Sequence, residues 1–260
     1  MPANPEARNL AVFCDFENVA LGVREAKYAQ FDMEKVLERL LAKGSIVVKK
    51  AYCDWDRYKE FKAPMHQASF ELIEIPHVRQ SGKNSADIRM VVDALDLCYT
   101  KAHVDTFVIV SGDSDFSPLV SKLRENAKTV IGVGVKNSSS DLLINNCDEF
   151  IYYDDLVRQD EQKRRAAKKR REAAPAGEDK KQEAFDVVLE TLNALIAERG
   201  AEEKIWGSMV KQALKRRKPG FNESYYGFRA FSDLLEEMQQ KGLIKLDPDE
   251  KSGGYLIRPA

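Results

Sequence analysis

The first 157 residues alternate between short runs of β-branched and apolar residues and longer stretches with apolar residues at helical spacing. Residues 106–110 are typical of a buried strand, and residues 85–100 carry an apolar stripe at helical spacing. This stripe consists of Ile88, Val91, Val92, Leu95 and Tyr99. Because strands that alternate with helices favour a parallel sheet covered by helices on both faces, we predict an α/β fold.

The same reasoning places the other elements of this part of the chain. Asp32 is a candidate N-cap for one helix and Gly44 a candidate for its end. The predicted strands are residues 10–14, 46–52, 72–75, 106–110, 129–135 and 150–152. The predicted helices begin after Asp32, near residue 64, and at residues 85, 119 and 141.

Composition divides the chain into two domains and a linker. Residues 1–157 form the α/β domain, and residues 158–183 are dominated by charged residues and alanines, which is typical of a linker. Residues 184–260 carry three helical stripes followed by two short strands around a Pro- and Gly-containing turn. Three helices with a terminal hairpin are the outline of a small winged-helix domain, which we predict here.

The overall composition excludes several classes of protein. Of 260 residues, 43% are hydrophobic and 32% are charged, which is typical of a chain with a folded core rather than of a disordered one. The apolar runs are far shorter than the roughly 20 residues that cross a membrane, and the N-terminus lacks a signal-peptide pattern. The four cysteines stand 39, 45 and 49 residues apart, so we expect reduced thiols in a cytoplasmic protein.

Four aspartates of the first domain stand at strand or helix ends. Asp15 ends the first predicted strand, Asp113 and Asp115 directly follow the strand of residues 106–110, and Asp87 lies in the first turn of a helix. Residues just past the carboxyl ends of parallel strands line the place where such sheets bind ligands. We therefore expect the four carboxylates to converge, although Asp87 and Asp115 also suit helix N-termini by themselves.

Converging carboxylates repel one another unless cations lie between them. Mg²⁺ and Mn²⁺ prefer oxygen ligands, and two such ions about 4 Å apart activate water and stabilise the leaving oxygen of a phosphodiester. We accordingly predict Asp15, Asp87, Asp113 and Asp115 to be catalytic residues and metal ligands. The candidates for contacts with the substrate in this domain are Asn18, Lys83 and Ser111.

These motifs resemble the NYN domain of the PIN-like nuclease superfamily. The resemblance covers roughly residues 8–157 and rests on Asp15 with Asn18, on KNSAD at residues 83–87, and on SGDSDF at residues 111–116. It looks closest to the small bacterial NYN proteins. It implies a PIN-like sheet and a metal-dependent ribonuclease with Asp15, Asp87, Asp113 and Asp115 as metal ligands.

Other patterns in this domain point elsewhere. Gly132-Val133-Gly134, with Asp154 about 20 residues on, partly matches a dinucleotide-binding fingerprint, but Asn137 replaces its third glycine. A tight turn after a strand is the preferred interpretation of these glycines. Trp55 and Tyr58 stand beside cations and suit either base stacking or packing on their own loop.

Basic residues gather in two places. Seven cations lie within residues 163–171, and five more, Lys211, Lys215, Arg216, Arg217 and Lys218, gather at the end of a predicted helix. Because cations avoid protein cores, we expect the second group to form an exposed patch, with Lys215, Arg216 and Arg217 contacting RNA.

The sequence around this patch resembles the LOTUS (OST-HTH) domain. The resemblance covers about residues 184–260 and rests on the basic helix end, on Pro219-Gly220-Phe221, and on YGFxxFxxLL at residues 226–235. It implies a winged-helix module that binds RNA, or in some relatives a protein partner.

We therefore predict a metal-dependent endoribonuclease that captures RNA through its C-terminal domain and leaves 5′-phosphate and 3′-hydroxyl ends. Two alternatives stay open at this point. One is an RNA-binding adaptor without catalysis, and the other is a small-molecule phosphohydrolase. The oligomeric state and the choice between Mg²⁺ and Mn²⁺ are not determined by the sequence.

Overall fold

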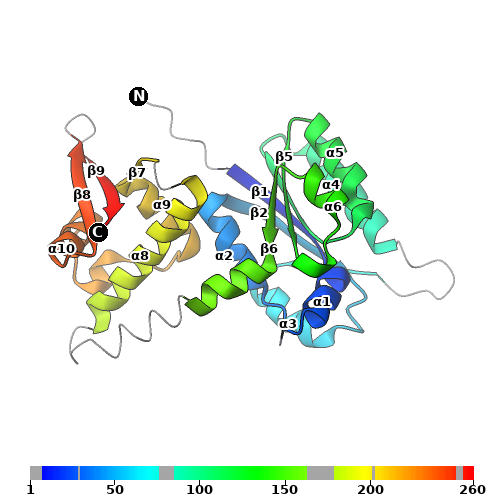
Figure 1. Ribbon diagram of the computed structural model, residues 1–260, viewed down its shortest axis with the longest axis horizontal. Helices are drawn as coiled ribbons and strands as arrows, with labels where there is room; N and C mark the ends of the chain where they lie inside the picture. Colours follow the sequence, from blue (N-terminus) through cyan, green and yellow to red (C-terminus); the bar gives the residue numbers. More distant parts are fainter. Residues whose placement is uncertain (1–7, 29, 76–84, 163–178, 201–202, 250–253) are drawn as a thin grey trace. The chain divides into compact units, whose positions relative to one another are not determined.

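The chain forms two compact units (Figure 1), one from residues 1–40 and 45–160 and the other from residues 41–44 and 161–260. The computed structural model describes residues 8–28, 30–75, 85–162, 179–200, 203–249 and 254–260. Among them, no helix is long and apolar enough to cross a membrane.

The first unit is an α/β domain. Its strands are β1 (Arg8–Asp15), β2 (Gly44–Cys53), β3 (Glu71–Glu74), β4 (Thr106–Val110), β5 (Thr129–Gly134) and β6 (Glu149–Tyr152). Its α-helices are α1 (Phe16–Glu25), α2 (Met33–Lys43), α3 (Lys59–Gln67), α4 (Ser85–Thr100), α5 (Ser117–Glu125) and α6 (Asp141–Asn146), and residues 153–162 are also helical. Two short 3₁₀-helices are η1 (Ser114–Phe116) and η2 (Lys136–Ser138).

The six strands form one parallel sheet in the order β3-β2-β1-β4-β5-β6. The direction in which the chain adds strands therefore reverses between β1 and β4. These two strands are in register, with Cys14 opposite Val110, so they end side by side. In sheets of this order, ligands bind at the carboxyl ends of the strands where the order reverses.

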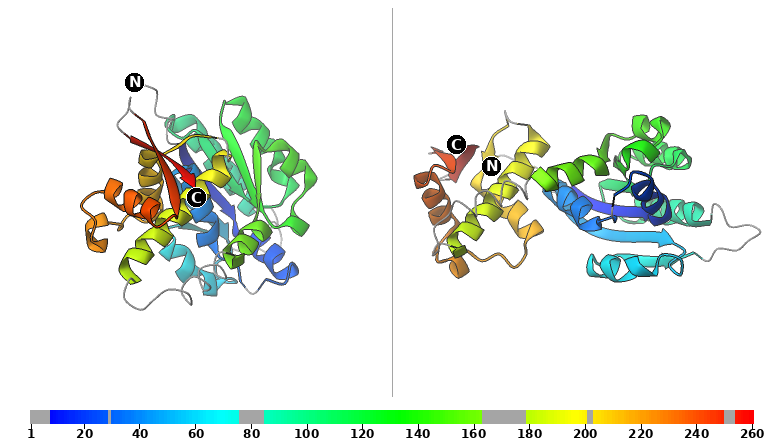
Figure 2. Two further views of the ribbon diagram at one scale, coloured as in Figure 1. Left: turned by 60° about the vertical axis from the view of Figure 1, so that its left-hand side comes forward. Right: turned by 60° about the horizontal axis from the view of Figure 1, so that its bottom comes forward.

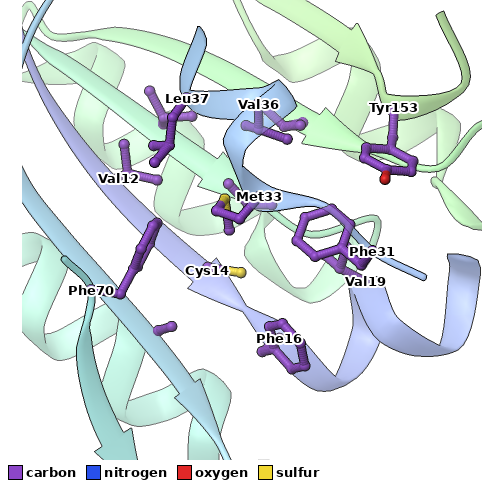
Figure 3. Close-up of a cluster of buried hydrophobic side chains, with 14 of the residues drawn as sticks. Val12, Cys14, Phe16, Val19, Phe31, Met33, Val36, Leu37, Phe70 and Tyr153 are labelled. Atoms are coloured by element: carbon purple, nitrogen blue, oxygen red, sulfur yellow. The ribbon is translucent and has the colours of Figure 1, made fainter. Parts of the chain in front are cut away.

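Helices cover both faces of the sheet (Figure 2). Successive residues of β1 point to opposite faces, so they contribute to two different cores. Val12 and Cys14 join a core that includes Val36 of α2, as Figure 3 shows, together with residues of α1 and α3. Ala11 and Phe13 join a second core, on the other face, with residues of α4, α5 and α6. The apolar run of β1 at residues 10–14 is therefore what a strand buried on both faces requires.

The second unit has its own apolar core and combines α-helices with a small sheet. Its elements are α8 (Asp179–Arg199), β7 (Ile205–Trp206), α9 (Gly207–Arg217), η3 (Glu223–Tyr226), α10 (Phe231–Gln240), β8 (Ile244–Asp249) and β9 (Gly254–Pro259). The strands pair antiparallel in the order β7-β9-β8.

The α/β prediction is confirmed, with differences at particular elements. Helix α2 ends at Lys43, directly before Gly44, as predicted, but Gly44 also begins β2. Helix α3 begins at Lys59 rather than near residue 64. Helix α1 was not predicted, because Gly22 and its β-branched valines are weak helix formers. Helix α8 begins at Asp179, inside the segment predicted to be a linker, while residues 163–178, with their seven cations, lie outside the described residues.

The predicted stripe of α4 is only partly buried. The helix buries Met90, Ala94 and Cys98 against the sheet, whereas three residues of the predicted stripe face solvent. These three are Ile88, Val92 and Tyr99, each more than half exposed. The helix is therefore apolar over a wider arc than the sheet covers.

The predicted turn at Gly132 and Gly134 is wrong, because both glycines lie within β5. A Cβ atom on Gly132 would stand 2.4 Å from the ring of Phe150, and one on Gly134 would stand 2.3 Å from Oγ of Ser139. The glycines thus allow neighbouring residues to pack directly on the strand. Asp154 is a structural residue that accepts hydrogen bonds from the hydroxyl of Tyr28 and the backbone of Lys136.

Candidate functional site

The candidate site lies at the carboxyl ends of β1 and β4, where the strand order reverses. Asp15 is the last residue of β1, and Ser111, Gly112 and Asp113 follow the last residue of β4. The side chains meet directly, because the hydroxyl of Ser111 donates a hydrogen bond of 3.0 Å to Oδ2 of Asp15. The sheet therefore brings together residues 96 positions apart in the sequence.

Asp15 is a buried carboxylate, with 7% of its surface exposed. Its pKa is raised to about 7, chiefly by burial and also by the charges of Asp87 and Asp113, against two hydrogen bonds that lower it. Those bonds come from the hydroxyl of Ser111 and from the backbone N–H of Asn18, at 3.3 Å from Oδ1. Through the second bond, Asp15 also caps the N-terminus of α1.

Asp87 lies in the first turn of α4 and is half-buried. Burial raises its pKa to about 6, and the charges of Asp113, Asp115 and Glu17 contribute in that order. Asp113 caps η1 by accepting a hydrogen bond of 3.0 Å from the backbone N–H of Asp115. Asp115 itself is exposed. The four predicted carboxylates thus act on one another electrostatically.

The four carboxylates suit a divalent cation in their chemistry but not in their arrangement. The donors are oxygen atoms, which Mg²⁺ and Mn²⁺ prefer, and the mutual elevation of pKa values means that a cation among them would relieve repulsion. Yet within the described ranges no three carboxylate, histidine or cysteine side chains are arranged to hold a metal ion. The predicted set therefore fits a cation in its chemistry and charge, but it does not form a closed ligand set.

The other predicted residues of this domain have different environments. Asn18 accepts a hydrogen bond of 2.9 Å from the backbone N–H of Gly112 and so fastens α1 to the loop after β4. Ser111 is fully buried and holds Asp15, so it positions a carboxylate instead of facing a substrate. Lys83 lies outside the described residues.

Gly112 is part of the site, although no role was predicted for it from the sequence motifs. A Cβ atom there would stand 2.3 Å from the backbone oxygen of Ser138, a distance that real Cβ atoms do not show. The carbonyl of Gly112 accepts a hydrogen bond of 2.9 Å from the backbone N–H of Ser140, and Ser140 in turn caps α6. The missing side chain therefore lets the loop after β4 lie directly against the loop before α6.

Trp55 does not belong to an exposed aromatic cluster. It is 1% exposed, its ring packs 5.0 Å from that of Phe16, and its Nε1 donates to the carbonyl of Ile73. The interpretation of Trp55 as a base-stacking residue is therefore wrong.

The basic patch predicted in the second unit is only partly exposed. Lys215 is exposed and Arg216 is half-buried. Arg217 is not part of an exposed patch, because its side chain is 4% exposed and pairs with Glu190 at 2.9 Å. It also donates to the hydroxyl of Thr191, so it joins α9 to α8.

Comparison with known proteins places the first unit in a family. The profile of the NYN domain matches residues 9–154, more than half of the chain. An uncharacterized protein of Methanocaldococcus jannaschii is 31% identical over 126 residues, which are 48% of this chain and 49% of that protein. Meiosis regulator and mRNA stability factor 1 of Xenopus tropicalis is 27% identical over 145 residues, which are 56% of this chain and 8% of that protein.

A solved structure has a similar fold. The crystal structure of a protein of unknown function from Vibrio parahaemolyticus is matched with a TM-score of 0.53 and 27% identity over 59% of this chain and 98% of that chain. This chain spans about half or less of the length of the curated relatives it matches. Since the family match covers residues 9–154 and includes all four carboxylates, the first unit is an NYN domain, and the chain belongs to the NYN family.

Proposed function

We propose that this protein is a metal-dependent endoribonuclease. The observation that carries the proposal is the meeting of carboxylates at the carboxyl ends of β1 and β4, where Ser111 bonds to Asp15. Burial and the neighbouring carboxylates raise the pKa of Asp15 and Asp87 there. An RNA phosphate is itself anionic, so these carboxylates repel it unless positive charge lies between them. A site of this kind is suited to phosphodiester chemistry with a divalent cation.

The residues that would hold Mg²⁺ or Mn²⁺ are Asp15, Asp87 and Asp113, with Asp115 at the exposed edge. The chemistry that such an ion supplies is activation of water and stabilisation of charge on the phosphodiester. Ser111 and Asn18 keep the carboxylate of Asp15 in a fixed orientation, and the cap on η1 does the same for Asp113. Fixed anionic groups of this kind need little reorganisation when a substrate binds.

Cleavage of a 5′-labelled single-stranded RNA tests the proposal. In Mg²⁺ or Mn²⁺ we expect products with 5′-phosphate and 3′-hydroxyl ends, and a loss of rate on the order of 100-fold in Asp113→Asn. The matched control is Asp141→Asn, because Asp141 is an exposed carboxylate that does not act on Asp15 or Asp87. Full activity in a chelator or in Asp113→Asn would contradict the proposal, and RNA binding without any cleavage would favour an adaptor.

We further propose that the second unit is a winged-helix module of the LOTUS type that captures RNA. The order of its elements supports this, with three helices and an antiparallel sheet of three strands. So do Lys215 and Lys218, which are exposed at the end of α9, and Tyr225, which is 63% exposed beneath the ammonium group of Lys180. Exposed cations and an exposed ring are the features that bind single-stranded nucleic acid.

A further inference from the structure

A groove of about 700 Å³ lies beside the carboxylates, between α4, α5 and α6. Its apolar lining includes Ile88, Val92 and Leu142, and its wall includes Asp87 and Asp115. The groove is therefore continuous with the candidate site. Its volume is in the range of pockets that bind small organic groups, about 300–1,000 Å³.

The apolar lining of this groove is unusually exposed. Ile88, Val92 and Leu142 are 63%, 55% and 58% exposed, and they are three of the six large apolar side chains that are exposed among the described residues. Apolar side chains that gather on a surface in this way mark a binding site more often than single ones do. The α4 stripe thus faces outward over the groove instead of into the core.

The groove also contains polar groups that suit a ligand with a polar edge. Ser117 lines it and is 6% exposed, yet its hydroxyl has no hydrogen-bond partner in the part of the chain that the structure describes. A buried hydroxyl without a partner costs free energy. Oγ of Ser117 is covered in this conformation, so a ligand recovers that free energy when the Ser117 side chain rotates toward the groove. Asn146, on the same wall, donates through Nδ2 to the carbonyl of Leu142, so the acceptor of its amide group, Oδ1, is not used in that bond.

We propose that this groove binds an unpaired nucleobase of the RNA strand whose phosphate lies at the carboxylates, an inference that rests on the proposed function. Among the described residues, the charged ones in the lining are both acidic, Asp87 and Asp115, so they repel a phosphate but not a neutral ring. A base offers apolar faces to Ile88 and Val92 and a polar edge to Ser117. Because a base inside the groove cannot be paired, the substrate class is single-stranded RNA.

Photo-crosslinking tests where the base lies. The full chain carrying Asp113→Asn, which is expected to cut RNA about 100-fold more slowly, is mixed with a single-stranded uridine octamer that contains one 4-thiouridine. Ultraviolet crosslinks are then mapped by mass spectrometry. We expect crosslinks to peptides of α4 or α6. Crosslinks confined to other parts of the chain would overturn the inference.

Binding of the same octamer to variants in this background gives a second readout. Val92→Ser should weaken binding about fivefold, as expected for part of one buried apolar side chain, and should remove the preference for an intact octamer over one with an abasic position. Ser117→Ala should remove part of that preference without lowering the melting temperature, since its hydroxyl bonds to none of the described residues. The matched control is Val47→Ser, at an exposed valine of β2 outside the groove.

The outcomes separate this inference from the proposed function. RNA cleavage with no effect of Val92→Ser or of abasic positions would overturn the inference alone. Crosslinks to α4 in a protein that cleaves no RNA would support the groove as a base site and contradict the nuclease. A dimer in solution that Val92→Ser dissociates would mean that a second copy covers the groove, and it would overturn the inference.

Discussion

Asp15 and Asp113 each have two roles at the residue scale. Both are N-caps, of α1 and of η1, and both carry charge at the edge of the sheet where β1 and β4 end. Their places could be predicted from the sequence, because each follows an apolar strand almost directly. The bonds from Ser111 to Asp15 and from Gly112 to Asn18 could not, since their partners are 96 and 94 residues apart and meet only when the sheet has formed.

The elevated pKa of Asp15 predicts how stability depends on pH. The folded protein holds this proton up to a pH of about 7, whereas the unfolded chain releases it near 3.8. The free energy of unfolding should therefore decrease as the pH rises from about 4 to about 7, by roughly 4 kcal/mol at about 1.4 kcal/mol per pKa unit. Asp15→Asn should remove this contribution while keeping the cap on α1.

Urea unfolding in a chelator between pH 4 and pH 8 measures this effect. The variant should be more stable than the wild-type protein at pH 8, and the difference should vanish near pH 4. Asp141→Asn is the control for a general change in charge. The explanation would be wrong if wild-type and Asp15→Asn proteins lost stability in parallel over this range.

At the scale of elements, prediction succeeded where one pattern dominated. The first and last residues of β4 were predicted correctly from its apolar run, and those of α4 from its long stretch of helical periodicity. Helix α3 was predicted too short, because Pro64 suggests a helix start but lies inside the helix. The buried face of α4 could not be predicted, since Ile88 and Val92 are as apolar as the residues that face the sheet, and only the neighbouring elements decide which are covered.

Packing of two loops on Gly112 gives a prediction at the same scale. Gly112→Ala should lower the free energy of unfolding by about 1–3 kcal/mol, since the methyl group meets the backbone of Ser138 and not a mobile side chain. Thermal unfolding of Gly112→Ala and of Gly220→Ala measures the difference. Gly220 is the matched control, because its Cβ position has no atom of the described residues within 4 Å. Equal melting temperatures would show that the two loops separate at little cost.

At the scale of the whole molecule, each of the two units has its own core. Composition alone predicted two domains, because the charged segment at residues 158–183 separates two sets of apolar stripes. It could not indicate that Arg217 is buried. A cation at a helix end looks the same in the sequence whether it meets solvent or, as here, Glu190 of another helix.

The salt dependence of RNA binding tests the role of the second unit. Lys215→Ala combined with Lys218→Ala should weaken binding of single-stranded RNA. It should also lower the slope of log K against log salt by about 0.7 for each phosphate that the lysines no longer neutralise. Lys101→Ala is the control, as an exposed lysine of the first unit. An unchanged affinity and slope would assign the second unit to a protein partner.

The capping roles of Asp15 and Asp113 affect which substitutions the family can tolerate at these two positions during evolution. Asparagine caps a helix about as well as aspartate does, and a single base change in the codon converts one into the other. Loss of negative charge at this edge of the sheet is therefore compatible with an intact scaffold. A single substitution can therefore produce a relative that keeps the fold and has no catalytic activity. We expect asparagine at the positions of Asp15 and Asp113 to identify such relatives.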